Sequence, residues 1–326
     1  MQIEKNAAII GFIGAGGFTE SKILPILKTT GAKLKGISSF SGFSATKLGK
    51  KFDFTYTTSD YEEILKDSQI DTVFITTKHD LHAKFVQEAL ISGKNVFVEK
   101  PLALNNEELE NIVDAYKSSN NTLTVGFNRR FSPFANKMKA VLGQSETPIN
   151  VIATMNAGMI PSNVWVHDLA VGGGRIIGEA CHYIDLCSYL TGSKVISVCM
   201  NSMGSNPEEN TDNASILLKY ENGSNAVINY FSNGSKGYSK ERVEVYSQER
   251  TWIVDNYRKT EAFSVNGFRT LKTKMDKGHK NQFHELIQRT QNGGEPLIPI
   301  NEIFNVTKAS FAAIESMKTR TWIEIK

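Results

Sequence analysis

The chain has 326 residues, of which 40% are hydrophobic, and this is enough apolar material for two packed cores. Its 37 basic and 34 acidic residues nearly balance, and no long lysine or arginine run supplies the surface that nucleic-acid-binding proteins need. The sequence starts without a signal-peptide layout and has no apolar run long enough to cross a bilayer. We therefore expect a cytoplasmic two-domain protein that binds neither nucleic acid nor membranes.

The cysteines agree with this expectation. Cys181, Cys187 and Cys199 are an odd set without a Cys-x-x-Cys pair. Such a set predicts neither a disulfide framework nor a metal site, and it fits a reducing compartment.

In the first 126 residues, short apolar runs alternate with amphipathic stretches. The runs have the length of buried parallel strands and cover residues 7–13, 34–38, 71–76, 95–98 and 122–125. A helix is expected after Asn105, which with Glu108 resembles a capping box. Another is expected from the shared face of Ala83, Val86 and Leu90. This alternation predicts a doubly wound, Rossmann-type α/β domain over residues 1–126.

Residues 127–326 follow a different pattern. Successive strands are expected between residues 195 and 273, where the runs 215–220 and 226–230 flank Asn222-Gly223, typical of a two-residue hairpin loop. The runs 242–246 and 251–254 form another expected antiparallel pair. A late helix is predicted by one apolar face made of Val306, Ala309, Ala313 and Met317. The second domain is therefore expected to be α+β with a large, mostly antiparallel open sheet.

The run Gly14-Ala15-Gly16-Gly17-Phe18-Thr19 directly follows the first expected strand and precedes a helix. In that context Gly14 permits a tight turn, and Gly16 lets backbone N–H groups approach a pyrophosphate at the helix N-terminus. Thr19 stands where a third glycine is usual, and glycine-rich turns also form for structural reasons alone. Within the βαβ context, the run predicts that the domain binds NAD(P).

The end of the second expected strand bears on the choice of cofactor. Domains that prefer NAD usually place an acidic residue there for the ribose diol, whereas this chain has Ser38-Ser39. Downstream, Lys47 and Lys51 are one helical turn apart and either approach a 2′-phosphate or only form a solvated helix face. The pattern slightly favours NADP over NAD.

Two further motifs suggest chemistry. Glu99-Lys100-Pro101 follows the strand expected at 95–98, at the sheet edge where such folds bind ligands. Later, Gly172-Gly173-Gly174 leads into an expected helix that carries His182 and Asp185 one turn apart. Each motif alone also fits a structural role.

Together these motifs resemble the Gfo/Idh/MocA superfamily of glucose-fructose oxidoreductases and inositol dehydrogenases, over nearly the whole chain. The segments 78–82, 126–133 and 178–182 look more narrowly like the second module of bacterial two-module proteins that begin with a zinc-type alcohol-dehydrogenase-like module. The resemblance implies a dehydrogenase that transfers a hydride between NAD(P) and a sugar, nucleotide-sugar or polyol. It also implies a homodimer or homotetramer joined through the open sheet, with a separate dehydrogenase module as a further partner.

The resemblance implies catalytic roles for two side chains. Lys100 would hydrogen-bond the reacting oxygen, and His182 would exchange the hydroxyl proton. The family commonly has Asp or Asn four residues before this histidine, whereas this chain has Gly178 followed by Glu179. Either Glu179 supplies the missing carboxylate through a shift of backbone register, or it points elsewhere.

The remaining candidates are implied to contact ligands. The cofactor-binding candidates, besides the glycine-rich run, Ser38, Ser39 and Lys100, are Thr76, Thr77, His79, His82, Glu99 and Asn128. The substrate-binding candidates are Arg129, Arg130, Trp165, His167, Asp185 and His279. Paired arginines suit planar anions and an aromatic face suits a sugar ring, although both also serve as structural residues.

Two other functions remain open on the sequence alone. The chain is either a catalyst or a non-catalytic NAD(P)-binding sensor on the same fold, because fold does not fix function. It is otherwise a partner subunit that responds to the redox state of a separate dehydrogenase. Lys100 and His182 favour catalysis, whereas Gly178 keeps the other functions open.

Overall fold

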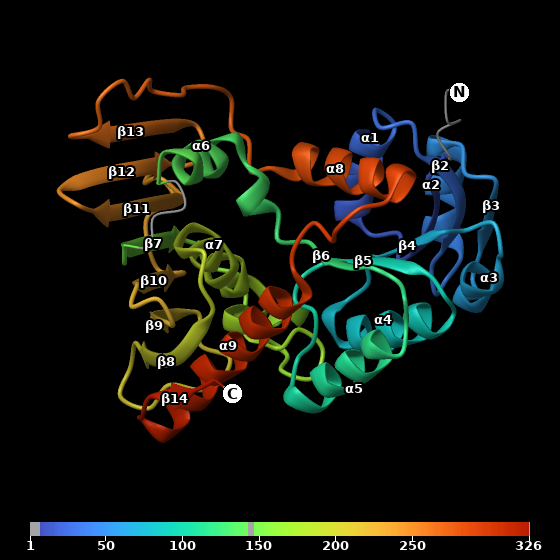
Figure 1. The fold of residues 1–326 in the computed structure, drawn as a ribbon. Helices are drawn as coiled ribbons and strands as arrows, with labels where there is room; N and C mark the ends of the chain where they lie inside the picture. Colours follow the sequence, from blue (N-terminus) through green and yellow to red (C-terminus); the bar gives the residue numbers. More distant parts are fainter. Residues whose placement is uncertain (1–6, 143–146, 326) are drawn as a thin grey trace. The chain divides into compact units, whose positions relative to one another are not determined.

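The computed structural model describes residues 7–142 and 147–325 (Figure 1). Contacts within the chain divide it into two units: unit 1 is Met1–Gly126 with His279–Ile300, and unit 2 is Phe127–Gly278 with Asn301–Lys326, as far as these are described. The first unit thus breaks after Gly126, where the expected domain 1–126 ends. The expected domain 127–326 differs from unit 2, because His279–Ile300 packs with unit 1.

Unit 1 is built on a parallel sheet with the strand order β3-β2-β1-β4-β5-β6. Its strands are β1 (Ile9–Ile13), β2 (Lys33–Ser38), β3 (Tyr56–Thr58), β4 (Thr72–Ile75), β5 (Asn95–Val98) and β6 (Leu123–Val125). The order reverses at β1 and β4, and doubly wound sheets bind ligands at the carboxyl ends of their strands beside such a reversal. The predicted Rossmann-type domain is confirmed.

Helices cover both faces of this sheet. They are the π-helical turn η1 (Thr19–Ile23), α1 (Leu24–Leu27), α2 (Phe43–Phe52), α3 (Tyr61–Lys66), the 3₁₀ turn η2 (His79–Leu81), α4 (His82–Ile91), α5 (Asn106–Lys117) and α8 (His279–Asn292). Figure 1 shows α8 beside α1, and these two helices contact each other.

Aromatic packing explains why α8 belongs to unit 1. Phe12, Phe74 and Phe97 on β1, β4 and β5 form a row on one sheet face, with ring centroids 5.0 and 4.8 Å apart. Phe283 of α8 packs against Phe97 with ring centroids 5.2 Å apart. All four rings are fully buried. Burying large aromatic side chains is strongly favourable, so this row fixes α8 on the sheet.

The start of α5 shows how local sequence sets an element boundary. The Asn105 side chain accepts a hydrogen bond of 2.9 Å from the Glu108 backbone N–H, as the predicted cap requires. The Glu108 carboxylate accepts from the Leu104 backbone N–H at 2.8 Å. The predicted cap is confirmed. The returning bond from the Glu108 side chain reaches the backbone N–H of Leu104, one residue before the cap, rather than that of Asn105.

Unit 2 is built on an eight-stranded sheet with the order β13-β12-β11-β7-β10-β9-β8-β14. Its strands are β7 (Asn150–Asn156), β8 (Val195–Ser202), β9 (Asn213–Tyr220), β10 (Asn225–Phe231), β11 (Glu241–Ser247), β12 (Arg250–Asp255), β13 (Lys259–Phe263) and β14 (Ile323–Glu324). Every pair is antiparallel except β7 with β10. The predicted mostly antiparallel sheet is confirmed.

The predicted hairpin forms between β9 and β10, but its loop is longer than expected. The Tyr220 backbone N–H donates to the Ser224 carbonyl, and the Gly223 N–H donates to the Tyr220 carbonyl, both at 3.0 Å. Residues 221–223 therefore form a three-residue loop rather than a two-residue turn. Such loops combine a turn with a glycine that closes it, so the same Asn-Gly signal serves both types.

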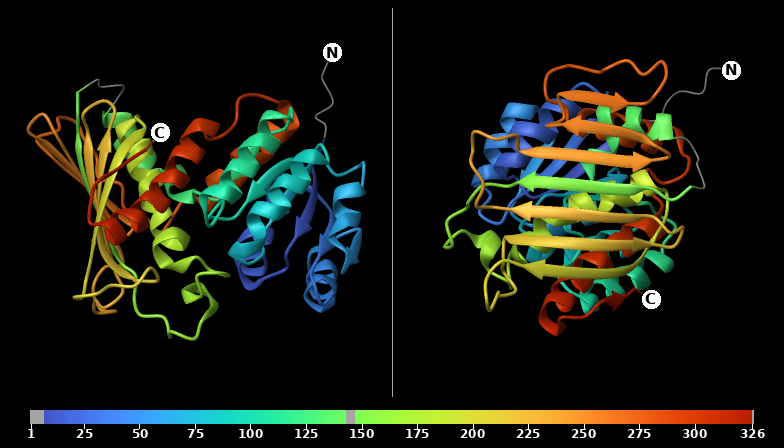
Figure 2. Two further views of the ribbon diagram at one scale, coloured as in Figure 1. Left: turned by 90° about the horizontal axis from the view of Figure 1, so that it is seen from below. Right: turned by 90° about the vertical axis from the view of Figure 1, so that its left-hand side faces the viewer.

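The helices of unit 2 lie on one face of its sheet. They are the 3₁₀ turns η3 (Asn128–Phe131) and η4 (Trp165–His167), the π-helical turn η5 (Ile176–Ala180), α6 (Pro133–Leu142), α7 (Cys181–Thr191) and α9 (Ile300–Thr319). Figure 2 shows the sheet face-on, with the described helices of the unit behind it. The late helix α9 buries Val306, Ala309, Ala313 and Met317, as predicted. In the described part of the chain, no helix covers the opposite face of this sheet (Figure 2).

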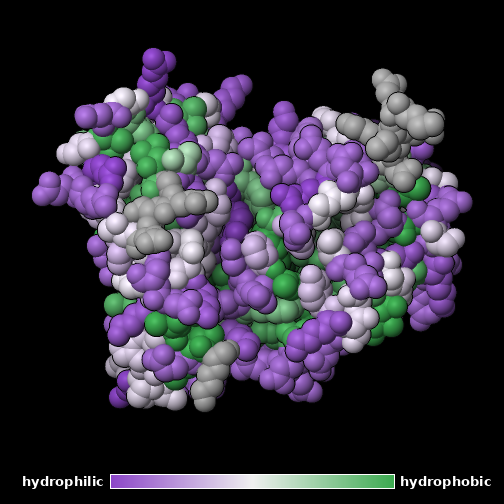
Figure 3. Space-filling model, in the orientation of Figure 1, coloured by the Kyte–Doolittle hydropathy of each residue, from purple (hydrophilic) through white to green (hydrophobic). Residues whose placement is uncertain are grey.

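Hydrophilic side chains cover most of the face shown in Figure 3. None of the helices in the described ranges is long and apolar enough to cross a membrane.

Candidate active site

The glycine-rich turn lies at the carboxyl end of β1. Gly14 has φ of 111°, and a Cβ placed on it would lie 2.7 Å from the Thr76 carbonyl carbon, so another residue would collide with β4. The Gly14 N–H donates to the Ser38 carbonyl at 3.0 Å, which ties the turn to β2. Among the described residues, nothing lies within 4 Å of a Cβ placed on Gly16 or Gly17. This open space beside a helix N-terminus fits a pyrophosphate.

Thr19 shows how the helix packs without the usual third glycine. Its buried hydroxyl donates to the Thr76 hydroxyl at 2.8 Å, and Thr76 donates to the Gly14 carbonyl at 3.1 Å. The start of the helix is therefore fastened to the turn and to the end of β4 by hydroxyl bonds. Thr76, an expected cofactor contact, also holds the turn in place.

The end of β2 has no acidic side chain. The Ser38 hydroxyl is buried and donates to the Phe12 carbonyl at 3.2 Å, while the Ser39 hydroxyl accepts from the Ala45 N–H at 3.0 Å. Ser39 therefore supports the start of α2.

The two lysines of α2 are exposed to solvent and also contact a carboxylate. Lys47 and Lys51 form ion pairs of 3.1 and 2.7 Å with Glu20 in η1. Hydrogen bonds from Lys51 and Lys47 lower the pKa of Glu20. The Glu20 carboxylate thus partly compensates the positive charge that both lysines would offer to a 2′-phosphate.

Glu99 directly follows β5 and is partly buried. A Cβ on Gly126 would lie 2.9 Å from both Glu99 carboxylate oxygens, so glycine at that position makes room for the group. Burial raises the pKa of Glu99 to about 7, although the neighbouring positive charge of Lys100 opposes the rise. The Glu99 N–H donates to the Ile75 carbonyl at 3.0 Å, which places Glu99 and Lys100 beside the end of β4.

His82 connects two loops at this sheet edge. Its Nδ1 lies 2.7 Å from the Pro101 carbonyl oxygen, and its Nε2 lies 3.3 Å from the Thr77 carbonyl oxygen. Burial lowers the pKa of His82 to about 4, so the ring is neutral at pH 7. His79 packs nearby, with ring centroids 5.6 Å apart. The His82 ring is therefore engaged by backbone and positions the loop that carries Lys100.

In unit 2, His182 occupies the first turn of α7 and is 8% exposed. The Phe127 ring meets it edge-on, with centroids 6.3 Å apart. The preceding residues form η5, a π-helical turn, so ordinary α-helical spacing does not apply to Glu179. Glu179 accepts hydrogen bonds from the Tyr230 hydroxyl at 2.6 Å and from Arg175 at 3.3 Å.

Arg129, an expected substrate contact, lies in a buried charge cluster. Its guanidinium donates to the Glu241 carboxylate at 2.9 and 3.3 Å, and Lys277 also bonds to that carboxylate. Burial disfavours the charge of Glu241, but Arg129 and Lys277 hold its pKa at about 2. Asn128, an expected cofactor contact, donates to the Lys277 carbonyl at 2.7 Å. These side chains fasten η3 to β11.

Arg130 is similarly occupied. Its guanidinium bonds to Asp185 of α7 at 2.6 to 3.1 Å and to Glu302 of α9 at 2.9 Å. Arg130 and Asp185 are both buried. Two residues that the sequence offered as substrate contacts therefore pair with each other inside unit 2.

The other expected substrate contacts lie in separate places. Trp165 and His167 form η4, where the His167 ring lies 3.2 Å from the Ile160 carbonyl oxygen. His279 begins α8 in unit 1, and its ring centroid is 5.7 Å from that of Phe18. His279 is thus a neighbour of the glycine-rich turn, which its distance in the sequence does not indicate.

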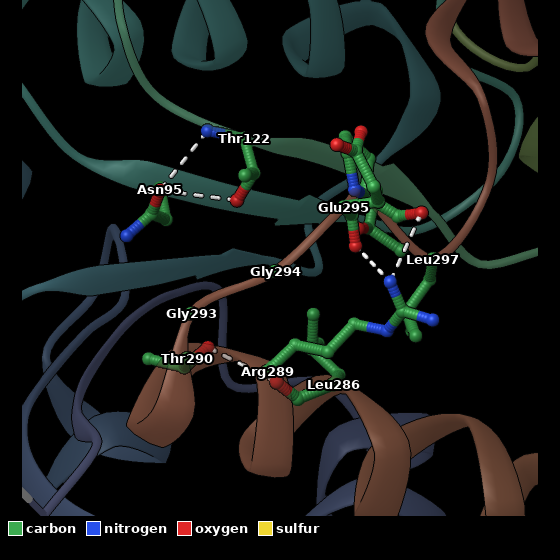
Figure 4. A pocket seen from close by; sticks show the side chains of 11 residues that line it. Asn95, Thr122, Leu286, Arg289, Thr290, Gly293, Gly294, Glu295 and Leu297 are labelled. Atoms are coloured by element: carbon green, nitrogen blue, oxygen red, sulfur yellow. Dashed lines mark hydrogen bonds between the residues drawn. The ribbon is translucent and has the colours of Figure 1, made fainter.

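Each unit has a pocket among its described residues. One, of about 390 Å³, lies in unit 2 and is lined by residues that include Gly158, Arg175, Glu179, Lys236, Tyr238 and Lys240. The other, of about 150 Å³, lies in unit 1 among Asn95, Thr122 and Arg289 (Figure 4). Asn95 and Thr122 lie at the amino ends of β5 and β6, opposite the cofactor edge, and bond to each other at 3.0 Å. The sequence did not single out Lys236, Tyr238 or Lys240.

The sequence matches known proteins along most of its length. Residues 9–127 match the family described as "Oxidoreductase family, NAD-binding Rossmann fold", and residues 143–253 match the "GFO/IDH/MocA C-terminal domain". The oxidoreductase YrbE of Bacillus subtilis is 31% identical over 77% of this chain and 75% of its own length. Myo-inositol 2-dehydrogenase of Thermotoga maritima is 23% identical over 97% of this chain and 98% of its own.

A solved structure shares the fold. Levoglucosan dehydrogenase in complex with NADH and levoglucosan superposes with a TM-score of 0.86 at 20% identity, covering 98% of this chain and 100% of that one. With the glycine-rich turn, the Glu-Lys-Pro edge and the sheet of unit 2 all in place, the chain belongs to the Gfo/Idh/MocA family of oxidoreductases with an NAD-binding Rossmann domain.

Proposed function

We propose that this oxidoreductase transfers a hydride between NAD(P) and a hydroxyl- or carbonyl-bearing carbon of a sugar, nucleotide-sugar or polyol. The observation that carries the proposal is the edge of the unit 1 sheet. There the open glycine-rich turn follows β1 and the Glu99-Lys100 pair follows β5, at the carboxyl ends of two strands that both pair with β4. Relatives named as dehydrogenases of myo-inositol and levoglucosan support this substrate class and favour catalysis over a sensor.

The chain would hold the cofactor through its glycine-rich turn, Gly14 to Phe18, and through residues that follow β2 and β4. The bound nicotinamide supplies the site that accepts or returns the hydride. In our proposal Ser39, Thr77 and His79 contact the cofactor. Ser38, Thr76 and His82 position the loops through hydrogen bonds to backbone carbonyl oxygens.

Lys100 and His182 are the proposed catalytic residues. The ammonium group of Lys100 donates a hydrogen bond to the reacting oxygen and stabilises its negative charge as the C–H bond breaks. His182 takes the proton of the substrate hydroxyl during oxidation and returns it during reduction. Glu179 would contact the substrate, while Arg129, Arg130 and Asp185 position η3 and α7 through their buried ion pairs.

The cofactor preference is a finer proposal. We favour NADP slightly, because no carboxylate at the end of β2 repels a 2′-phosphate. Pairing of Lys47 and Lys51 with Glu20 weakens their contribution. We also propose that the protein is cytoplasmic and forms a homodimer or homotetramer. A further proposal is that it associates with a separate alcohol-dehydrogenase-like module, and co-purification tests this association.

The experiment is calorimetric titration of NADH and NADPH, followed by a screen of sugars, polyols and nucleotide-sugars at the nicotinamide absorbance band. In Lys100→Met, turnover should fall by about 10²-fold or more, because the reacting oxygen loses its charged donor. The affinity for the cofactor should change less than about threefold. Lys117→Met, at the exposed end of α5, is the matched control and should retain full turnover. Absence of binding by both cofactors, or unchanged turnover in Lys100→Met, would refute the proposal.

A further inference from the structure

The pocket of unit 2 has the size of a small-molecule site. Its volume of about 390 Å³ lies within the range of ligand pockets, which is roughly 300 to 1,000 Å³. One wall comes from the end of β7 and the residues after it. The others come from Arg175 and Glu179 around η5 and from the connection between β10 and β11.

The charge of Arg175 is compensated inside the wall. One guanidinium nitrogen donates to the Gly158 carbonyl at 2.8 Å and lies 3.4 Å from Asp212, and the other lies 3.3 Å from Glu179. The guanidinium also stacks over the Tyr230 ring at 5.3 Å. Arg175 is buried. It therefore shapes the pocket rather than supplying a free positive charge.

Lys236 and Lys240 differ from Arg175 in this respect. Both are exposed lining residues of the pocket. No ion pair within the described part of the chain includes either of them. Arg175 pairs with both Glu179 and Asp212, and this group carries one net negative charge. The two lysine ammonium groups exceed it and leave the pocket region with one net positive charge.

The loop that carries the two lysines is anchored at both ends. The backbone N–H of Asn156 donates to the Lys240 carbonyl, and its side-chain amide donates to the Ser235 carbonyl, both at 2.7 Å. The Tyr238 N–H closes a turn onto the same Ser235 carbonyl at 3.1 Å. Because β7 fixes this loop, binding a ligand would require little ordering of the backbone.

We infer that this pocket binds a sugar or polyol that carries an oxyanion group, either a carboxylate or a phosphate, and that Lys236 and Lys240 contact that group. The ammonium group of lysine is a compact point charge at the end of a flexible side chain, which suits an oxyanion. Tyr238, 62% exposed, offers an aromatic face to the sugar ring. The inference deepens the proposed function, on which it rests, by adding an acidic group to the substrate class.

Calorimetry on the full chain with saturating NADH tests the inference with three hexoses: D-glucose, D-glucuronate and D-glucose 6-phosphate. At least one acidic sugar should bind about tenfold or more tightly than glucose, because two ammonium groups attract its charge. The double variant Lys236→Gln/Lys240→Gln should lose this advantage while its affinity for glucose stays constant. Lys274→Gln, an exposed lysine of unit 2 outside the pocket lining, should behave as the unchanged chain.

The two acidic sugars separate the sources of the oxyanion. Preference for glucuronate assigns a carboxylate, and preference for glucose 6-phosphate assigns a phosphate. The inference is overturned if glucose binds as tightly as both acidic sugars, if neither acidic sugar binds, or if Lys274→Gln loses as much affinity as the double variant.

Failure of the proposed function has a different signature. In that case the acidic sugar still binds with the lysine dependence, but no sugar, acidic or neutral, changes the nicotinamide absorbance. Turnover of neutral and acidic sugars at equal kcat/KM would instead retain the dehydrogenase and reject the oxyanion pocket.

Discussion

At the scale of single residues, Glu99 is unusual, because its carboxyl group lies beside Lys100 in surroundings that disfavour its negative charge. Burial raises its pKa from 4.5 to about 7. The unfolded chain therefore loses this proton at lower pH than the folded protein does. As pH rises from about 4.5 to about 7, the folded state loses stability relative to the unfolded chain, by up to about 3 kcal/mol.

Glu99→Gln removes this dependence. The variant should match the wild-type melting temperature near pH 4.5 and melt at a higher temperature above pH 7, measured by differential scanning calorimetry across that range. Glu107→Gln, exposed on α5, is the control and should show no difference that grows with pH. If Glu99→Gln melts below wild type at pH 8, the carboxyl is charged and well satisfied in the folded protein, contrary to the prediction.

Residue types alone predicted the glycine-rich turn but not the buried partners of the two arginines. Gly14 has a positive φ and no room for a Cβ, so this position requires glycine and can be recognised in the sequence. Arg129 and Arg130 instead pair with Glu241 and Asp185, which are 112 and 55 residues away. No spacing rule connects such distant partners, and an arginine next to a predicted ligand edge looks the same whether it binds substrate or a buried carboxylate.

At the scale of secondary-structure elements, the Arg130 cluster joins three segments of unit 2. Arg130 lies in η3, Asp185 in α7 and Glu302 in α9. The sequence predicted α7 and α9 as separate helices and did not predict η3, and this one guanidinium connects all three. A buried ion pair is costly to break, because the remaining charge stays in the interior without its partner.

Arg130→Met should therefore destabilise the protein by about 3 to 5 kcal/mol, measured as a shift of the denaturation midpoint in urea. The double variant Arg130→Met/Asp185→Leu should recover much of the loss, since it leaves neither buried charge unpaired. Arg242→Met breaks a pair with Glu244 that is more exposed, and it should cost about 1 kcal/mol or less. Equal losses in Arg130→Met and Arg242→Met would contradict a special role for the buried cluster.

The sequence predicted the buried apolar elements and failed on an exposed strand and on a helix distant in the sequence. β5 and β6 are short apolar runs that are mostly buried, and α5 has one apolar face. In contrast, β3 has only three residues, Tyr56 to Thr58, at the edge of its sheet, and was not predicted. Similarly, α8 lies between two segments of unit 2 in the sequence, and its packing on the sheet and on α1 assigns it to unit 1.

At the scale of the whole molecule, the exposed face of the unit 2 sheet is the surface where we expect another subunit to bind. Ile152, Val227 and Leu217 are direct cross-strand neighbours on β7, β10 and β9, and they alternate with the buried residues that face the helices. Because β7, β10 and β9 are consecutive strands in the middle of the sheet, these residues form an apolar row across it. A contiguous apolar row on an exposed sheet is typical of an interface.

This row is where we expect two copies of the chain to meet in the proposed homodimer or homotetramer. A charge placed there would be buried without a partner in the assembly, so Leu217→Glu/Val227→Glu should separate the subunits while each remains folded. Light scattering after size exclusion should give a multiple of the monomer mass for the wild type and the monomer mass for the variant, with circular dichroism unchanged. Met203→Glu, at an exposed apolar residue of unit 2 in the loop after β8, is the control and should keep the wild-type mass. A wild-type chain that is monomeric at micromolar concentration, or a double variant that keeps the larger mass, would assign the apolar row to the monomer's own surface.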